Sequence, residues 1–229
     1  MSEPNYGRAF QDGLVMTSPT GDNTNGETEH LALRTHILGK LVVTSGKIVA
    51  CDPLIMPDEL PFADTIAPGR YPVIISVAEL AANDECVAFA LLRLSERPAV
   101  RWENAAPQGK NLVELEPNHV YRYGVDTGTG CFMDADAAQA LQALANAAKR
   151  GDHEDDSGLM AALLASGNGI GGWQANFVLD EATGANVIAF TYGLGDGFYP
   201  SFWGYDASGQ RVALVTDFEV IDAAWLTQL

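Results

Sequence analysis

Turn sequences alternate along this chain with short runs rich in valine, isoleucine and aromatic residues, and from Trp173 onward the turns recur at hairpin spacing. Glycine and proline mark these turns, because glycine accepts positive φ angles and proline cannot donate to a strand ladder. The clearest pairs of runs are 40–44 with 47–51 around Ser45-Gly46, and 201–205 with 211–216 around 206–209. This spacing predicts antiparallel hairpins rather than parallel strands joined by helices.

Other runs add strands to this pattern. We expect strands at 71–77, 85–94, 100–102, 119–123, 173–179 and 187–192, with a C-terminal antiparallel meander from Trp173 onward. The run at 85–94 is ambiguous, because alanine and leucine favour a helix whereas Val87 and Phe89 fit the two-residue period of a strand. The turn-like sequence that precedes this run favours the strand.

One segment, 134–150, has the features of a long helix. Asp134 is suited to cap its first turn, and Lys149 and Arg150 suit the negative end of the helix dipole. A shorter helix is expected at 159–165. The sequence therefore predicts an α+β fold, a largely antiparallel β-sheet of hairpins and a C-terminal meander with one main helix and one short helix.

The first thirty residues differ from the rest of the chain. They are rich in polar residues and glycine and show no hydrophobic period. We expect an irregular N-terminal arm at 1–30 and a single α+β domain at 31–229.

The charge is strongly acidic, with 30 Asp and Glu residues against 13 Lys and Arg, a formal net charge of −17. A nucleic-acid backbone or an anionic membrane would repel such a surface, so neither is an expected partner. A basic protein partner is electrostatically favourable. No apolar run reaches the length of a membrane helix and the N-terminus lacks a secretory pattern, so we expect a cytoplasmic protein.

Metal and cofactor motifs are weak. The three cysteines form no C-x-x-C pair, and the four histidines form no zinc-protease pattern. The segment 167–172 matches G-x-G-x-x-G, but it follows a predicted helix instead of a strand, so it is interpreted as a connector. We expect no metal and no cofactor.

The candidate catalytic groups are few. Asp126-Thr127-Gly128 follows a strand end, as in aspartic proteases, although that chemistry needs two such loops. Cys131 follows two glycines that would let a substrate approach. The alternative function that these groups allow is a hydrolase using Asp126 and Asp196 with Cys131 or a bound metal.

The segment 192–206 has the strongest binding character, because it combines aromatic residues with glycines and aspartates. Aromatic side chains supply large contact areas at low entropy cost. The predicted binding residues are Asp126, Asp196, Phe198, Tyr199, Trp203, Tyr205 and Asp206. With no complete catalytic constellation, the preferred function is a non-catalytic protein-binding domain, for example an immunity-type protein that binds a basic partner or toxin.

Several short segments together resemble a family of bacterial proteins defined as a domain of unknown function, DUF4241. The segments are 45–53, 124–130, 195–200, 203–206 and 216–218, and the resemblance extends over most of the chain from about Leu38. It implies one domain and a bacterial cytoplasmic setting, and it brings no activity, cofactor or catalytic residue. It also implies that five aspartates belong to recurring segments: Asp52, Asp126, Asp196, Asp206 and Asp217. These either converge in an acidic cleft or serve separately as turn residues, and we favour separate turns.

Overall fold

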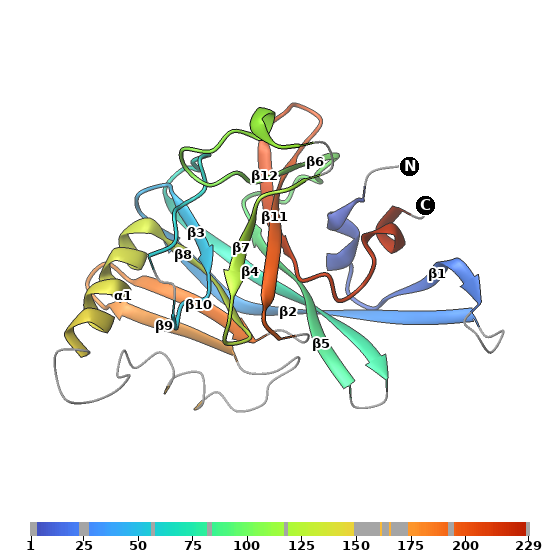
Figure 1. Ribbon diagram of the computed structural model, residues 1–229, viewed down its shortest axis with the longest axis horizontal. Helices are drawn as coiled ribbons and strands as arrows, with labels where there is room; N and C mark the ends of the chain where they lie inside the picture. The colour runs from blue at the N-terminus through green and yellow to red at the C-terminus, as the bar shows by residue number, and fades with distance from the viewer. Residues whose placement is uncertain are drawn as a thin grey trace.

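A computed structural model of the chain describes residues 4–22, 28–55, 58–81, 84–116, 119–148, 174–191 and 195–227, with the single residues 161 and 165. It consists of two curved antiparallel sheets packed face to face (Figure 1). The predicted α+β class is confirmed.

The larger sheet has eight strands in the order β1-β2-β4-β5-β12-β11-β6, with β7 also paired to β11. Their bounds are β1 (Leu14–Asp22), β2 (Thr28–Val43), β4 (Gly69–Ala81), β5 (Asp84–Arg93), β12 (Arg211–Asp217), β11 (Gly197–Tyr205), β6 (Arg101–Asn104) and β7 (Arg122–Val125). The smaller sheet has the order β3-β8-β10-β9, with β3 (Ile48–Cys51), β8 (Thr129–Asp134), β10 (Ala185–Thr191) and β9 (Gln174–Asp180).

Helix α1 (Ala135–Ala148) covers the outer face of the smaller sheet (Figure 1). Two short 3-10 turns, η1 (Tyr6–Phe10) and η3 (Ala223–Thr227), cover the outer face of the larger sheet, and η2 (Leu112–Glu114) lies in a loop. Within the described residues, no helix combines the length and hydrophobicity needed to span a membrane.

The central strands of the larger sheet bury both faces, which explains their nearly continuous runs of valine, isoleucine and leucine. In β12, Leu214 packs into the core between the sheets, whereas Val215 packs against the 3-10 turns on the other side. In β4, Ile75 and Ile74 divide in the same way. Alternate residues of a strand point to opposite faces, so both layers depend on the same strands.

A buried asparagine joins the two sheets. The Asn186 side chain on β10 accepts a hydrogen bond from the Val42 amide and donates one to the Lys40 carbonyl, both on β2. The amide group thus imitates a backbone pairing partner, and it satisfies polar groups that would otherwise be buried without hydrogen bonds.

Two local predictions are confirmed. The ambiguous run at 85–94 is strand β5. Helix α1 starts directly after Asp134, whose carboxylate accepts the Asp136 amide at 2.9 Å in the geometry of a cap. The predicted helix at 159–165 lies outside the described residues, apart from 161 and 165.

The predicted hairpin around Ser45-Gly46 is wrong. Strand β2 pairs with β4, whereas β3 pairs with β8, so the turn is a corner where the chain changes sheets. The Gly46 φ of +78° and the 2.6 Å that would separate an added Cβ from the Ile66 carbonyl both require glycine here. The Ser45-Gly46 sequence, which resembles a hairpin turn, instead allows the backbone at Gly46 to lie close to the Ile66 carbonyl.

The C-terminal meander and the N-terminal arm also differ from expectation. Strands β9 and β10 form one hairpin and β11 and β12 another, but the hairpins belong to different sheets. Residues 6–10 and 14–22, expected to be irregular, form η1 and β1. In this region Met16 and Ala9 are buried, so a few apolar residues hold the segment on the sheet without a visible period.

Candidate functional site

The structure separates the predicted binding residues. Trp203 is 1% exposed and Tyr199 is buried, and both belong to the core between the sheets. They cannot contribute to an exposed binding surface. Alternate residues of a strand point to opposite faces, and Tyr199 and Trp203, four residues apart on β11, both point inward.

Tyr205 and Asp206 lie at the other end of β11 from Asp196. Asp206 is a turn residue whose Oδ1 accepts from Ser208 and Gln210, while its second oxygen pairs with Arg97. The Ser208 hydroxyl and these backbone donors lower the pKa of Asp206. Tyr205 is half-buried beneath the guanidinium of Arg101, 4.2 Å from the ring centre. The Asp206 carboxylate is thus used by internal contacts, whereas Tyr205 lines an open hollow together with Arg97 and Arg211.

Asp52 is fully buried and organises the β7–β8 turn. One of its oxygens accepts from the Asp126 and Thr127 amides and from the Thr127 hydroxyl, and the other accepts from the Leu54 amide. These hydrogen bonds fix the backbone of the turn, although Asp52 lies seventy-four positions before Asp126 in the sequence. The Asp126 carboxylate itself is exposed and makes no hydrogen bond or ion pair with another described residue.

The pairing of β7 with β11 brings Asp126 and Asp196 together at one end of the two strands. Gly197 pairs with Val125, and the two aspartates are the next residues beyond that pair. Asp196 is exposed and, within the described part of the chain, its carboxylate has no hydrogen-bonding or ionic partner. The five aspartates do not converge, because Asp206 lies at the far end of β11.

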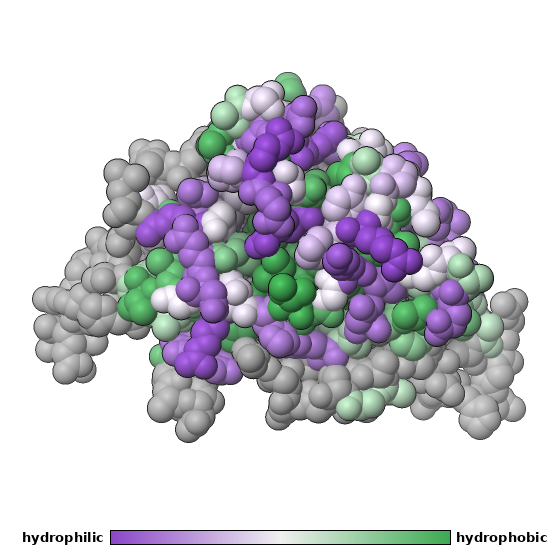
Figure 2. All heavy atoms as spheres, turned by 180° about the vertical axis from the view of Figure 1, so that it is seen from behind, coloured by the Kyte–Doolittle hydropathy of each residue, from purple (hydrophilic) through white to green (hydrophobic). Residues whose placement is uncertain are grey.

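Phe198 belongs to the same end. It lies two residues after Asp196, near the start of β11. It is 69% exposed and pairs with Gly124, which has no side chain to cover it. We call Phe198, Asp126 and Asp196 the Phe198 face. On the face seen in Figure 2, apolar residues lie in patches separated by polar ones, so exposure alone marks no site.

Cys131 is not part of this surface. It is fully buried on β8 opposite Cys51 of β3, with 3.8 Å between the two sulfur atoms. Burial, together with a hydrogen bond to the neighbouring thiol, raises the pKa of Cys51. A thiol with no exposed surface cannot meet a substrate, so the arrangement provides no cysteine nucleophile.

We therefore expect the thiols to be inert in the folded protein. All three cysteines are buried, so Ellman's reagent should react with them only as fast as the protein unfolds, and with all three in urea. The absorbance of the released thiolate measures this directly. Rapid labelling of Cys131 in the native protein, located by mass spectrometry, would contradict the expectation and restore the hydrolase hypothesis.

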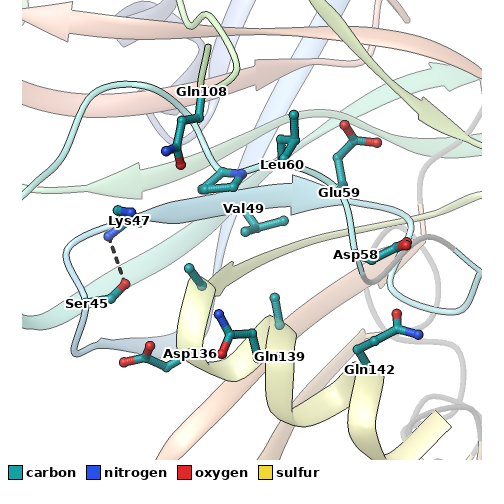
Figure 3. Close-up of a pocket in the computed structure, with 13 residues that line it drawn as sticks. Ser45, Lys47, Val49, Asp58, Glu59, Leu60, Gln108, Asp136, Gln139 and Gln142 are labelled. Carbon is teal, nitrogen blue, oxygen red and sulfur yellow. Dashed lines mark hydrogen bonds between the residues drawn. The ribbon is translucent and has the colours of Figure 1, made fainter. Parts of the chain in front are cut away.

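An open groove of about 460 Å³ lies between α1, strand β3 and the segment 58–61 (Figure 3). Its apolar wall comes from Val49, Leu60, Pro61, Ala135 and Ala138, and its polar groups from Ser45, Lys47, Asp58, Glu59, Gln108, Asp136, Gln139 and Gln142. Hydrogen bonds from Phe62 to the Ile48 carbonyl and from Gln108 to the Pro61 carbonyl hold the segment beside β3. The groove is thus built on fixed backbone.

Sequence reasoning missed this groove. Asp136, Gln139 and Gln142 follow a three-residue spacing, which places them along one face of the predicted helix. The side of the groove formed by the helix could therefore have been predicted from the sequence. The other half could not, because nothing in the proline-rich segment 53–61 indicates that it returns to the helix. In the described part of the chain, no three histidine, cysteine or acidic side chains are placed to hold a metal ion.

Comparison with known proteins gives a family but no activity. No curated protein and no solved structure matches the chain. The model of the family described as "Protein of unknown function (DUF4241)" matches residues 41–216, from the end of β2 to the end of β12. This range includes Asp52, the Phe198 face and the groove. The chain belongs to the DUF4241 family.

Proposed function

We propose that the protein is a non-catalytic domain that binds a basic protein partner, in the manner of an immunity protein that neutralises a toxin. The observation that carries the proposal is the Phe198 face, an exposed aromatic ring beside two carboxylates that have no described partner. An arginine or lysine of a partner would contact the ring through cation–π attraction and the carboxylates through charge-assisted hydrogen bonds.

Two further properties support this function. The net charge of −17 attracts a basic protein over long range and accelerates its encounter. Asp52 fixes the backbone that presents Asp126, so little conformational entropy is lost when that turn binds. A cytoplasmic location remains part of the proposal, since a toxin-neutralising domain of this kind acts where the toxin would.

The test begins with a photo-crosslinking amino acid at position 198, used in cells of the source organism to capture and identify the partner. Association of the purified pair is then measured against salt concentration. We expect a basic partner, an association rate that falls with salt, and about tenfold or greater weakening by Phe198→Ala. The double variant Asp126→Asn and Asp196→Asn should mainly slow association.

Matched controls exclude general surface effects. Val113→Ala removes another exposed apolar side chain, and Glu96→Gln with Glu116→Gln removes two exposed charges elsewhere. These variants should bind within about twofold of the wild type. The proposal fails if the captured protein is not basic, if its association ignores salt, or if the controls weaken binding as much as the Phe198 variant.

A further inference from the structure

The groove between α1 and β3 carries an unbalanced charge. Three carboxylates line it, Asp58, Glu59 and Asp136, against the single ammonium of Lys47. Two negative charges therefore remain for a ligand to neutralise. Figure 3 shows Asp136 at the end of the groove near Ser45, and Asp58 and Glu59 toward the other end.

Helix geometry gives the distance between the two ends. Asp136 and Gln142 are six residues apart on α1, which corresponds to about 9 Å along the helix axis. Gln142 lies at the Asp58 end (Figure 3). Between the ends the wall is apolar, formed by Val49, Leu60 and Ala138 among others. The pattern along the groove is therefore carboxylate, hydrocarbon, carboxylate.

A buried acceptor in the groove also needs a donor. The Oε1 atom of Gln142 is buried and accepts no hydrogen bond from any described residue, while its Nε2 donates to Asn146. A buried polar atom without a partner costs free energy, which a ligand N–H would recover. This observation is independent of the charges, and it indicates a ligand that donates hydrogen bonds near Asp58.

We propose that the groove binds a linear aliphatic di- or polyamine. One ammonium group lies near Asp136, and another lies between Asp58 and the Gln142 carbonyl oxygen. The methylene chain covers the apolar wall. The volume of about 460 Å³ is in the range of small-molecule sites, and the positive charges balance those of the groove. This site is separate from the Phe198 face and does not depend on protein binding.

Each part of the groove selects against other ligands. The two net negative charges disfavour the binding of anions. The apolar wall offers no oxygen ligand to a hydrated metal ion. An exposed acidic surface attracts any polycation weakly, but salt screens that attraction within about 8 Å at physiological ionic strength. Retention of binding in salt is thus the distinguishing property.

The experiment is isothermal titration of the full chain with spermidine at about 150 mM NaCl, a physiological ionic strength. We expect saturable binding of one molecule per chain. Combining Asp58→Asn with Asp136→Asn should weaken it at least about tenfold, because a charge-assisted contact is lost at each end of the groove. Gln142→Leu should weaken it by less while keeping the side-chain volume.

The control variant is Glu96→Gln, an exposed charge outside the groove, which should bind within about twofold of the wild type. Unchanged circular dichroism verifies folding of each variant. Absence of saturable heat, equal weakening by the control, or displacement of spermidine by millimolar Mg²⁺ would each overturn the proposal. The last result would show a general cation surface instead of an amine site.

Discussion

Replacing Asp134 with alanine should lower the free energy of unfolding by about 3 kcal/mol. The buried carboxylate accepts hydrogen bonds from the amides of Thr44, Ser45 and Asp136 and from the Ser45 hydroxyl. One side chain therefore caps α1 and closes the corner between β2 and β3. Urea denaturation followed by circular dichroism measures the loss.

The matched control is Asp136→Ala. Asp136 is exposed at the same helix end and accepts only the Thr44 hydroxyl at 2.8 Å, so this variant should cost well under about 1 kcal/mol. Asp134→Asn should fall between the two, because it keeps one acceptor oxygen and loses the charge. If Asp134→Ala were no more harmful than Asp136→Ala, the corner would not depend on this carboxylate.

The second large effect is a loss of stability with rising pH, caused by Asp217. This side chain is buried at the end of β12, and burial raises its pKa to about 7. The charge of Glu219 contributes to this rise, whereas hydrogen bonds from the Glu219 amide and Tyr6 and the charge of Arg122 oppose it. The ionised form is therefore the unfavourable one in the folded protein.

The sign of the pH dependence follows from this shift. The folded pKa lies above the ordinary value of 3.8, so the folded state holds the proton more tightly than the unfolded chain. Its contribution to stability is complete below pH 4, declines as the pH rises from about 4 to 7, and is lost above 7. Three pKa units correspond to about 4 kcal/mol.

Asp217→Asn tests this directly. The variant keeps an acceptor for the Glu219 amide but cannot ionise, so at pH 8 it should be about 3 kcal/mol more stable than the wild type. At pH 4 the two should be nearly equal. The measurement is urea unfolding across this pH range, with Glu116→Gln, an exposed charge, as the control. If the difference in the free energy of unfolding between the variant and the wild type did not depend on pH, the assignment to Asp217 would be wrong.

Local signals predicted much of the secondary structure. Runs of β-branched residues identified most of the strands, because such residues fit a pleated buried surface whichever strand lies beside them. The cap at Asp134 located the start of α1 for a similarly local reason. These features depend on neighbours in the chain, so a single sequence contains them.

Which strands pair with one another could not be predicted from these local signals. Ser45-Gly46 has the composition of a hairpin turn, but the residue that fixes it is Asp134, ninety positions after Thr44. Likewise, the exposure of Phe198 depends on its pairing with Gly124, and the groove depends on the return of segment 58–61 to α1. The acidic and aromatic residues were visible in the sequence, whereas which of them share a surface was not.

The position of β12 has a consequence for protein synthesis. This strand is made late, yet it lies in the middle of the larger sheet, between β5 and β11. While the nascent chain is still emerging from the ribosome, the edge of β5 has no partner and offers unpaired amides and carbonyls to other chains. The larger sheet closes only after residues 211–217 have emerged, so the edge of β5 is exposed to aggregation until that point.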